Sequence, residues 1–357
     1  MQTMTDLEKL CSRVTEAADC AVITDDVNRR YFTAMKSSAG TLVVFPEKAY
    51  FIIDFRYIEK AKKTVTACEV ILQDKLYEQI NSLIEKHGAK TVSVNADTCT
   101  LSELIAYQQK LNAEVIADTK LAEIIREIRT VKSQEQIDKI IKAQRIAEKG
   151  FAHMLDFIKV GRTEKEIQLE LDYYMLKNGA EALSFDTIAL SGSNTSLPHG
   201  VPSDKKVESG EFVLMDFGAT YDGWHSDMTR TVCVGKPSDK MKSVYETVLN
   251  AQLSALDAVK AGMSGKELDK IARDIITDAG YGDNFGHSLG HGVGVEIHES
   301  PYASPSREDI LPENSIVTVE PGIYLEGKFG VRIEDFVVVT ENGCINMTKA
   351  PKELICL

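Results

Sequence analysis

Two acidic residues lie on one face of a predicted β-hairpin in the C-terminal part of the chain. The run FVLMDFGATYDGWHSDMTRTVCV (212–234) contains Asp-Gly at 222–223, a strong signal for a two-residue turn. That turn places Asp216 opposite Thr229, and Asp227 becomes a diagonal neighbour on the same face. Carboxylates placed in this way are suited to acid–base chemistry or to binding a metal ion.

A second predicted hairpin places two further acids directly across from each other. It spans SIVTVEPGIYLEGKFGVRIEDFVVV (315–339), with a three-residue loop at 326–328. In that register Glu320 faces Glu334. Two like charges so close destabilise a sheet unless something compensates for them.

The neighbours of these four acids are largely apolar, so we expect the carboxylates to be partly buried. Several buried charges without partners cost more free energy than a fold tolerates. Protonation, pairing with arginine or binding of divalent cations would each compensate. Four carboxylates suffice to hold two cations about 3.5–4 Å apart. The alternative is that each acid lies on an exposed strand face and is solvated.

The histidines are concentrated in the same region. Five of the seven fall between positions 199 and 298: His199, His225, His287, His291 and His298. The segment HSLGHGVGVEIHE (287–299) is the most obvious source of a nitrogen ligand, because its glycines let the backbone approach closely. It matches neither G-x-G-x-x-G nor H-E-x-x-H. The alternative is that these histidines pack individually in the core.

The elements that must position these side chains form an internal repeat. Residues 160–167 (VGRTEKEI) and 261–268 (AGMSGKEL) both read G-x-[ST]-x-x-E, which is a turn glycine followed by a helix-starting capping box. Both predicted helices stop at a glycine thirteen residues after that glutamate, Gly179 and Gly280. Each then leads to a strand that carries an acid. The equal spacing favours a duplicated α+β half.

The N-terminal part predicts a separate α/β domain. Strand-like runs at 41–45, 50–54 and 91–94 alternate with helical periodicity around 75–87 and 101–112.

A boundary is predicted ahead of a long helix. Ser133 and Gln136 form a capping box before an amphipathic stretch at about 134–158. We therefore predict one domain over residues 1–127 and a second over residues 128–357.

Composition excludes several classes of protein. Against 41 Lys and Arg stand 54 Asp and Glu, a formal net charge of −13, which disfavours a nucleic-acid backbone as the main partner. No run approaches the roughly 18 apolar residues of a membrane span, and the start has no apolar core typical of a signal peptide. Seven cysteines without a C-x-x-C motif indicate free thiols in the reducing cytoplasm.

Five ordered motifs resemble those of the metallopeptidase family that contains Xaa-Pro aminopeptidase (aminopeptidase P), prolidase and methionine aminopeptidase. They are SLPHG (196–200), MDFGATYDGWHSDMTRT (215–231), HSLGHGVGVEIHE (287–299), TVEPGIY (318–324) and GVRIEDFVVV (330–339). The resemblance covers roughly residues 130–357 and implies the duplicated pita-bread fold. The N-terminal α/β domain is similar to the creatinase-N-like domain of the Xaa-Pro-cleaving members.

The resemblance implies a centre of two divalent metal ions. Its implied ligands are Asp216, Asp227, His291, Glu320 and Glu334. By similarity, Asp227 and Glu334 would bridge both ions. An oxygen-rich set with one imidazole suits Mn²⁺, with Zn²⁺, Co²⁺ or Fe²⁺ as alternatives.

The resemblance also implies a hydrolytic mechanism. The ions would lower the pKa of a bridging water. Glu320 would accept a proton from that water and pass it to the leaving nitrogen. His199 and His298 would stabilise the tetrahedral oxyanion or hold the substrate.

Three more residues are expected to line the same pocket. His287 belongs to the glycine-rich segment, and Tyr324 lies where its hydroxyl can donate a hydrogen bond into the site. Arg332 is expected to bind a carboxylate, either that of Glu334 or the C-terminus of a substrate. An ion-pair role for Arg332 and a packing role for Tyr324 are the alternatives.

The expected function is metal-dependent hydrolysis of Xaa-Pro bonds, at the N-terminus of peptides or in dipeptides, by a cytoplasmic homodimeric metallo-exopeptidase. Its partners are short proline-containing peptides rather than nucleic acid or membrane. A non-catalytic pita-bread binding protein and a creatinase-like metal-independent hydrolase are the alternatives, and the presence of all five ligands disfavours both. Trp224 and His225 depart from the usual family residues, and an additional metal-site role for His225 stays open.

Overall fold

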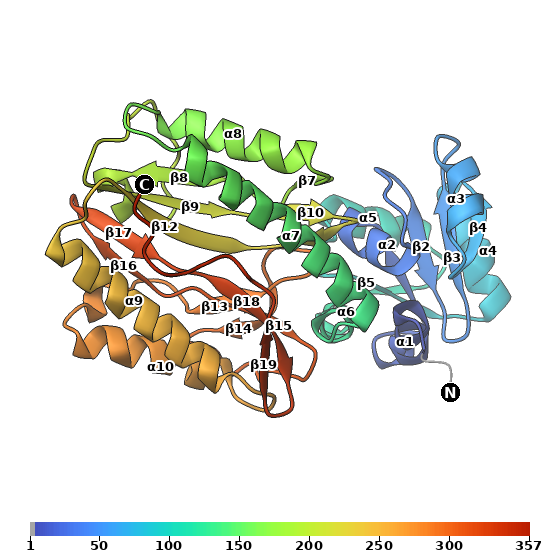
Figure 1. Ribbon diagram of the computed structural model, residues 1–357. Helices are drawn as coiled ribbons and strands as arrows, with labels where there is room; N and C mark the ends of the chain where they lie inside the picture. The colour runs from blue at the N-terminus through green and yellow to red at the C-terminus, as the bar shows by residue number, and fades with distance from the viewer. Residues whose placement is uncertain (1–3) are drawn as a thin grey trace. The chain divides into compact units, whose positions relative to one another are not determined.

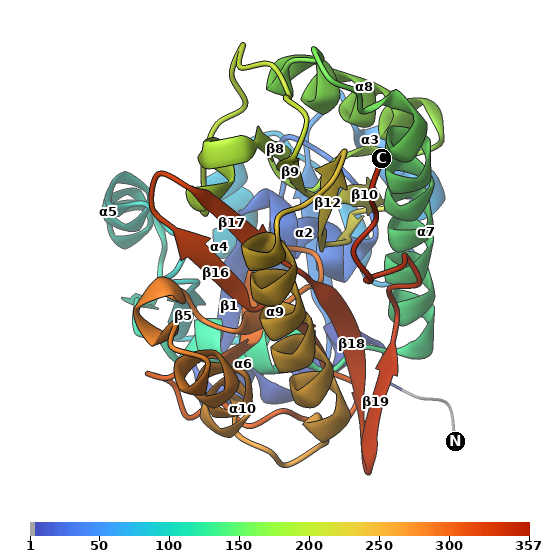
Figure 2. The ribbon, with the colours of Figure 1, turned by 60° about the vertical axis from the view of Figure 1, so that its left-hand side comes forward.

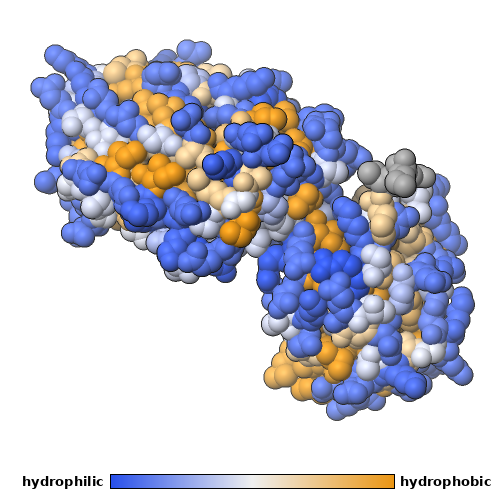
Figure 3. All heavy atoms as spheres, turned by 90° about the horizontal axis from the view of Figure 1, so that it is seen from below, coloured by the Kyte–Doolittle hydropathy of each residue, from blue (hydrophilic) through white to orange (hydrophobic). Residues whose placement is uncertain are grey.

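The computed structural model describes residues 4–357, which divide into two compact units (Figure 1). The first unit ends at Arg129 and the second runs from Thr130 to Leu357. Among the described residues, no helix is both long enough and apolar enough to cross a membrane. The face drawn in Figure 3 is mainly hydrophilic, with groups of hydrophobic residues between hydrophilic ones.

The first unit is a six-stranded sheet with helices on both faces. Its helices are α1 (Asp6–Arg13), α2 (Asp26–Thr33), α3 (Ile58–Thr64), α4 (Leu76–His87), α5 (Leu101–Lys110) and α6 (Lys120–Thr130). Its strands are β1 (Cys20–Ile23), β2 (Thr41–Val44), β3 (Ala49–Ile53), β4 (Glu69–Leu72), β5 (Thr91–Val94) and β6 (Glu114–Ile116). The strand order is β4-β3-β2-β1-β5-β6. The predicted alternation of strands and helices is therefore confirmed.

The central strand β1 shows how this sheet is covered. Successive side chains of a strand point to opposite faces. Ala21 and Ile23 pack with residues of α1, α2 and α6, whereas Cys20 and Val22 pack with residues of α4 and α5. Because both faces are buried, all four residues of β1 are buried.

The second unit contains four long helices and several small sheets. The helices are α7 (Gln134–Phe157), α8 (Glu164–Lys177), α9 (Asp239–Ala258) and α10 (Gly265–Asp278). The strands of its first half are β7 (Ala182–Leu183), β8 (Ile188–Ser191), β9 (Glu211–Phe217), β10 (Ala219–Tyr221), β11 (Trp224–His225) and β12 (Met228–Val234). Those of its second half are β13 (Gly290–Gly292), β14 (Glu299–Ala303), β15 (Ile316–Val319), β16 (Gly322–Leu325), β17 (Phe329–Arg332), β18 (Asp335–Thr340) and β19 (Gly343–Asn346).

The two halves of this unit have corresponding layers. In the first, the sheet β12-β9-β8 packs against α7 and α8, and in the second, the sheet β15-β18-β19 packs against α9 and α10. The helix pairs lie on opposite sides of the strands, with α7 and α8 in green and α9 and α10 in orange (Figure 1). Figure 2 shows α9 lying across β16 and β17, with which it is in contact.

The helix starts follow the predicted capping signals. Ser133, Thr163 and Ser264 each accept a hydrogen bond from the backbone three residues later, and the Glu or Gln there returns one, which makes three complete capping boxes. Gly179 and Gly280 follow the ends of α8 and α10 with positive φ values of 107° and 85°. Glycine adopts this left-handed conformation without the steric penalty that other residues face.

The predicted registers of both hairpins are confirmed. Thr229 pairs with Asp216 in the β9–β12 ladder. In the second hairpin, Gly322 pairs with Arg332 in one ladder and Val319 pairs with Asp335 in the next. Both ladders have the same register, so they place Glu320 across from Glu334 where the pairing is interrupted.

Candidate metal centre

The five predicted ligands come from the middles and ends of strands in both halves of the second unit. Asp216 belongs to β9, and Asp227 lies between β11 and β12. His291 is the middle residue of β13. Glu320 directly follows β15, and Glu334 lies between β17 and β18. The backbone at these interruptions is held by bonds to other strands or loops, since Glu320 N donates to Leu289 O at 2.9 Å and Glu334 N donates to Thr229 O at 3.1 Å.

Three of these residues form a compact group that could hold a metal ion. One ligand atom each of Asp227, His291 and Glu334 lies within 4.8 Å of the other two. His291 Nε2 is 3.6 Å from Asp227 Oδ2 and 3.3 Å from Glu320 Oε1. The fold therefore brings three of the four predicted carboxylate ligands close to the imidazole of His291, the fifth predicted ligand.

Asp216 is joined to this group through a buried arginine. The guanidinium of Arg332 binds Asp216 and donates to the Tyr324 hydroxyl at 2.7 Å. Glu334 instead accepts a 2.6 Å hydrogen bond from the Thr229 hydroxyl. Of the two carboxylates expected for Arg332, Glu334 is therefore wrong as its ion-pair partner, and the cross-strand geometry supplies Asp216.

Burial and mutual repulsion disturb the titration of these acids. Burial raises the pKa of Asp227 and of Glu334 well above the usual range, and the other carboxylates add to the effect. Burial also raises the pKa of Asp216, although Arg332 opposes that change. Raised carboxyl pKa values of this kind are typical of acidic side chains that cluster at a ligand site.

His291 and Glu320 form the oppositely charged side of the cluster. Burial alone would lower the pKa of His291, but the Glu320 and Asp227 carboxylates outweigh it and raise that pKa to about 9. Burial would raise the pKa of Glu320, but the hydrogen bond and charge of His291 hold it at about 2. The two side chains therefore behave as an ion pair at neutral pH.

Two carboxylate oxygens fit a divalent cation. Asp216 Oδ1 and Glu334 Oε1 are buried and have no hydrogen-bond partner in the structure. A buried acceptor without a partner is costly, and a divalent cation between the carboxylates would satisfy both oxygens. The residues present therefore fit a divalent metal centre.

The remaining predicted residues lie around this cluster. His287 Nε2 is 2.9 Å from the Tyr324 hydroxyl, which links it to Arg332. The His298 ring meets the His291 ring edge-on at a centroid separation of 4.4 Å. His199 is exposed, and its charge contributes to the lowered pKa values of His287 and His298, after the larger effect of their burial.

His225 has a different environment from the metal cluster. It pairs with Thr220 across the β10–β11 ladder, and its Nδ1 is 3.4 Å from the Thr220 hydroxyl. It does not belong to the one potential ligand group found within residues 4–357.

Two threonines and an ion pair were missed as parts of the site. Thr318 donates to Glu320 at 3.0 Å and accepts the backbone N–H of His291, also at 3.0 Å. Thr229 joins Glu334 to Arg332. Thr318 is two residues before Glu320 and Thr229 is two residues after Asp227, so the predicted register was a signal for both threonines. The ion pair of Asp269 and Arg273, on α10, had no such signal.

Comparison with known proteins identifies the family. Residues 138–341 match the model of metallopeptidase family M24, and residues 7–131 match the creatinase/prolidase N-terminal domain. The chain belongs to metallopeptidase family M24. Membership of this family implies divalent metal ions, in agreement with the cluster of buried carboxylates. The expected order of a creatinase-N-like domain before a pita-bread domain is confirmed.

Several full-length relatives of this M24 peptidase have names that refer to Xaa-Pro substrates. A Xaa-Pro dipeptidase of Pyrococcus furiosus is 40% identical, with 98% of this chain and 99% of the relative covered. The solved structure of a Xaa-Pro dipeptidase from Bacillus anthracis is 42% identical, covers 99% of both chains and has a TM-score of 0.95. That of an X-Pro aminopeptidase from Thermotoga maritima is 38% identical, covers 95% of this chain and 98% of that one, and has a TM-score of 0.90.

Proposed function

We propose that this M24 peptidase hydrolyses Xaa-Pro bonds, in dipeptides or at the N-terminus of longer peptides. The observation that carries the proposal is the convergence of Asp227, His291 and Glu334 into one group, together with two buried carboxylate oxygens of predicted ligands that have no partner. The relatives named Xaa-Pro dipeptidase and X-Pro aminopeptidase support the substrate class.

Two divalent ions, with Mn²⁺ as the first candidate, are proposed as the cofactor. The ligands would be Asp216, Asp227, His291, Glu320 and Glu334. Asp227 and Glu334, whose pKa values are raised by burial and by the other acids, would both contribute carboxylates to the centre. Four carboxylates and one imidazole make a predominantly oxygen set, which suits Mn²⁺, and Zn²⁺, Co²⁺ and Fe²⁺ are the alternatives.

The bound ions would supply Lewis acidity and an activated water. Glu320 is ionised at neutral pH, so its carboxylate is ready to accept the proton of that water and return it to the leaving nitrogen. The pKa of His298 is lowered by burial, so a neutral imidazole is available to donate an N–H to the developing oxyanion. Exposed His199 would hold the substrate.

Arg332 and Tyr324 are proposed to organise the site. The Arg332 guanidinium already serves Asp216, Tyr324 and Thr229, so we assign it to holding Asp216 in place rather than to binding a substrate carboxylate. Tyr324 connects it to His287, which would line the substrate pocket. The scissile Xaa-Pro nitrogen has no N–H, so no acceptor for such a group is required.

The remaining proposals concern the whole molecule. We infer that residues 128–357 form the catalytic domain and residues 1–127 the domain that precedes it. A cytoplasmic location is supported by seven cysteines that are all free thiols. A homodimer is proposed on the family resemblance, and light scattering of the purified protein tests it.

Hydrolysis assays with and without metal test the function. We expect cleavage of Ala-Pro and of a longer Ala-Pro-Yaa peptide with Mn²⁺, and loss of both activities after chelation. Comparison of the two rates distinguishes a dipeptidase from an aminopeptidase. Asp227→Asn and Glu334→Gln should abolish activity, whereas Asp239→Asn, which alters an exposed acid on α9, should not.

Two results would contradict this proposal. Undiminished hydrolysis after complete metal removal would favour a creatinase-like metal-independent enzyme. Tight binding of proline peptides without turnover, at any metal loading, would favour a binding protein on the same fold.

A further inference from the structure

The last residues of the chain run beside β12 as a parallel strand. Cys233 donates its backbone N–H to Ile355 O at 2.9 Å, and Leu357 donates to Cys233 O at 2.9 Å. These two bonds make Cys356 the direct bridge partner of Cys233. Neighbouring strands lie about 4.7–4.9 Å apart, which falls inside the Cα separation of about 4.4–6.8 Å that a disulfide requires.

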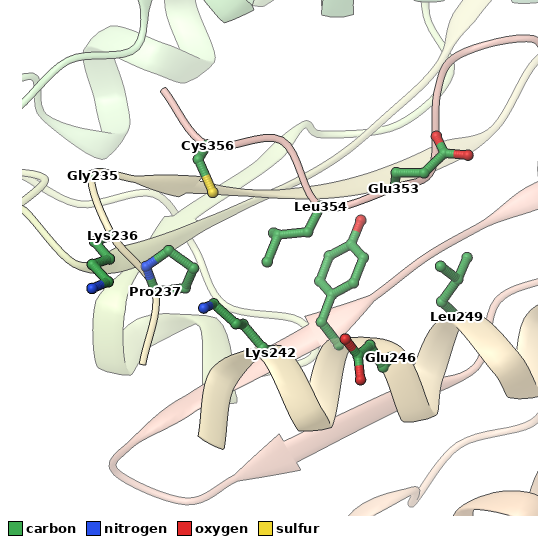
Figure 4. A pocket seen from close by; sticks show the side chains of 10 residues that line it. Gly235, Lys236, Pro237, Lys242, Glu246, Leu249, Glu353, Leu354 and Cys356 are labelled. Carbon is green, nitrogen blue, oxygen red and sulfur yellow. The ribbon is translucent and has the colours of Figure 1, made fainter. Parts of the chain in front are cut away.

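The two thiols also share one environment. Partners in a parallel ladder project their side chains to the same side of the sheet. Cys233 belongs to a core cluster that includes Tyr245 of α9. Cys356 lines a cavity of about 640 Å³ that Tyr245 also lines (Figure 4). Both cysteines therefore face α9.

Access to the two thiols is unequal. Cys233 is completely buried, and burial raises the pKa of its thiol to about 11. Cys356 is exposed, and the cavity beside it is lined by two lysines, Lys236 and Lys242, and by two acids, Glu246 and Glu353 (Figure 4). Because Cys233 is buried, a small disulfide reagent meets the thiol of Cys356 first.

We propose that Cys233 and Cys356 form a reversible intramolecular disulfide when the protein meets a small disulfide of the glutathione type. The Cys356 thiolate attacks the reagent, which forms a mixed disulfide and releases one small thiol. The Cys233 thiol then loses its proton and attacks Cys356 Sγ, which forms the intramolecular bond and releases the second small thiol. Two protein thiols are oxidised and one reagent disulfide is reduced.

The disulfide would also anchor the C-terminal segment, residues 350–357, to the rest of the second unit. This segment is called the strap below. Arg230 donates to the backbone carbonyls of Ala350 and Pro351 at 2.8 Å each, and Tyr245 donates to Lys352 O at 2.8 Å. With the disulfide formed, the residues after Pro351 can no longer detach by local unfolding, because Cys356 is bonded to β12. We expect trimming by a carboxypeptidase to slow by about tenfold or more in the oxidised protein.

Thiol trapping with peptide mass spectrometry tests the pairing. The full-length protein is incubated with glutathione disulfide, alkylated and digested. We expect a Cys233–Cys356 cross-linked peptide and loss of two of the seven thiols, both reversed by dithiothreitol. Cys344→Ser, at a half-buried thiol in the same unit, should cross-link as the wild type does. Cys356→Ser should form no cross-link and should keep Cys233 unmodified.

Three outcomes would overturn the proposal. They are a mixed disulfide at Cys356 that never resolves, a cross-link to any other cysteine, and attack on Cys233 in the Cys356→Ser variant. Cys356→Ser changes an exposed residue, so the test does not depend on a disrupted core. The trimming rate of oxidised wild type against oxidised Cys356→Ser gives a second readout, and equal rates would contradict the proposed strap.

Discussion

The guanidinium of Arg273 forms two hydrogen bonds with the carboxylate of Asp269 one turn earlier on α10. Nε donates to Oδ2 at 2.7 Å and Nη2 donates to Oδ1 at 2.9 Å. The same guanidinium donates to the carbonyls of Phe285 and His287, each at 2.8 Å, and Asp269 accepts the N–H of Leu289 at 3.0 Å. A single helix surface thus holds both ends of the segment that leads to His291.

We expect Arg273→Lys to lower kcat for Ala-Pro by about 10- to 100-fold, because a lysine keeps the charge but cannot hold both carbonyls and the carboxylate. The far-ultraviolet circular dichroism spectrum should stay unchanged. Lys270→Arg, at an exposed position on the same helix, is the matched control. Wild-type kcat in the Arg273→Lys variant would show that the pair does not position the histidine segment.

Thr229 is predicted to tune the metal centre. Its hydroxyl donates to Glu334 at 2.6 Å and accepts from Arg332 Nε at 3.1 Å. Thr229→Val removes both bonds at similar volume, and we expect Mn²⁺ affinity to fall about 10- to 100-fold. Thr229→Ser keeps the hydroxyl and should bind like the wild type. Isothermal titration calorimetry measures both, and equal affinities of the two variants would refute the assignment.

Metal binding is predicted to release protons. Without metal, His291 has a pKa of about 9 and keeps its proton near neutrality, and the raised pKa values of Asp227 and Glu334 favour their protonated forms. Metal binds the deprotonated forms, so affinity should rise with pH toward that value. Calorimetry in two buffers of different ionisation enthalpy counts the protons, and identical heats in both buffers would contradict this expectation.

The same shifts predict how the metal-free protein responds to pH. Carboxyl groups whose pKa is higher in the folded state lose stabilising protonation as pH rises from about 4, and His291 loses its contribution as pH passes about 9. We therefore expect the chelated protein to unfold at lower temperature at about pH 8.5 than at about pH 6. Added Mn²⁺ should raise the unfolding temperature more at the higher pH. A larger effect at the lower pH would reverse the assigned sign.

A buried ion cluster beside the metal ligands is predicted to be structurally essential. Asp335 binds Arg230 at 2.7 Å and also Lys352, and the Asp335 side chain is fully buried. Asp335→Asn leaves Arg230 without its charge partner, and we expect a loss of about 3–5 kcal/mol in the free energy of unfolding. Glu308→Gln breaks the exposed pair with Lys266 and should cost less than about 1 kcal/mol. Urea unfolding compares the two, and similar losses would contradict the burial argument.

Local sequence signals predicted the parts of this site that depend on periodicity and turns. The hairpin registers placed Thr229 opposite Asp216 and Glu320 across from Glu334 before any tertiary contact was known. Capping boxes at Thr163 and Ser264 determined where α8 and α10 begin. Such features depend on interactions within a few residues or across one turn.

The partners of charged side chains could not be predicted in the same way. Arg332 lies two residues before Glu334, yet its ion-pair partner is Asp216 on a different hairpin. Asp269 and Arg273 have ordinary helical spacing, and only the return of residues 285–289 to α10 gives the pair its additional role. The first contact depends on how the two halves pack and the second on how residues 285–289 return to α10, and spacing along the chain encodes neither.

The two duplicated halves give their corresponding carboxylates different charged partners at the shared centre. Asp216 and Glu320 occupy matching places in the repeat, but the first has a guanidinium beside it and the second an imidazole. The two carboxylates occupy matching positions in the repeat but are chemically different, so the two sides of the centre are not equivalent. The charge beside Asp216 is permanent, whereas the charge beside Glu320 titrates with His291, so a change of pH alters one side of the centre and leaves the other paired.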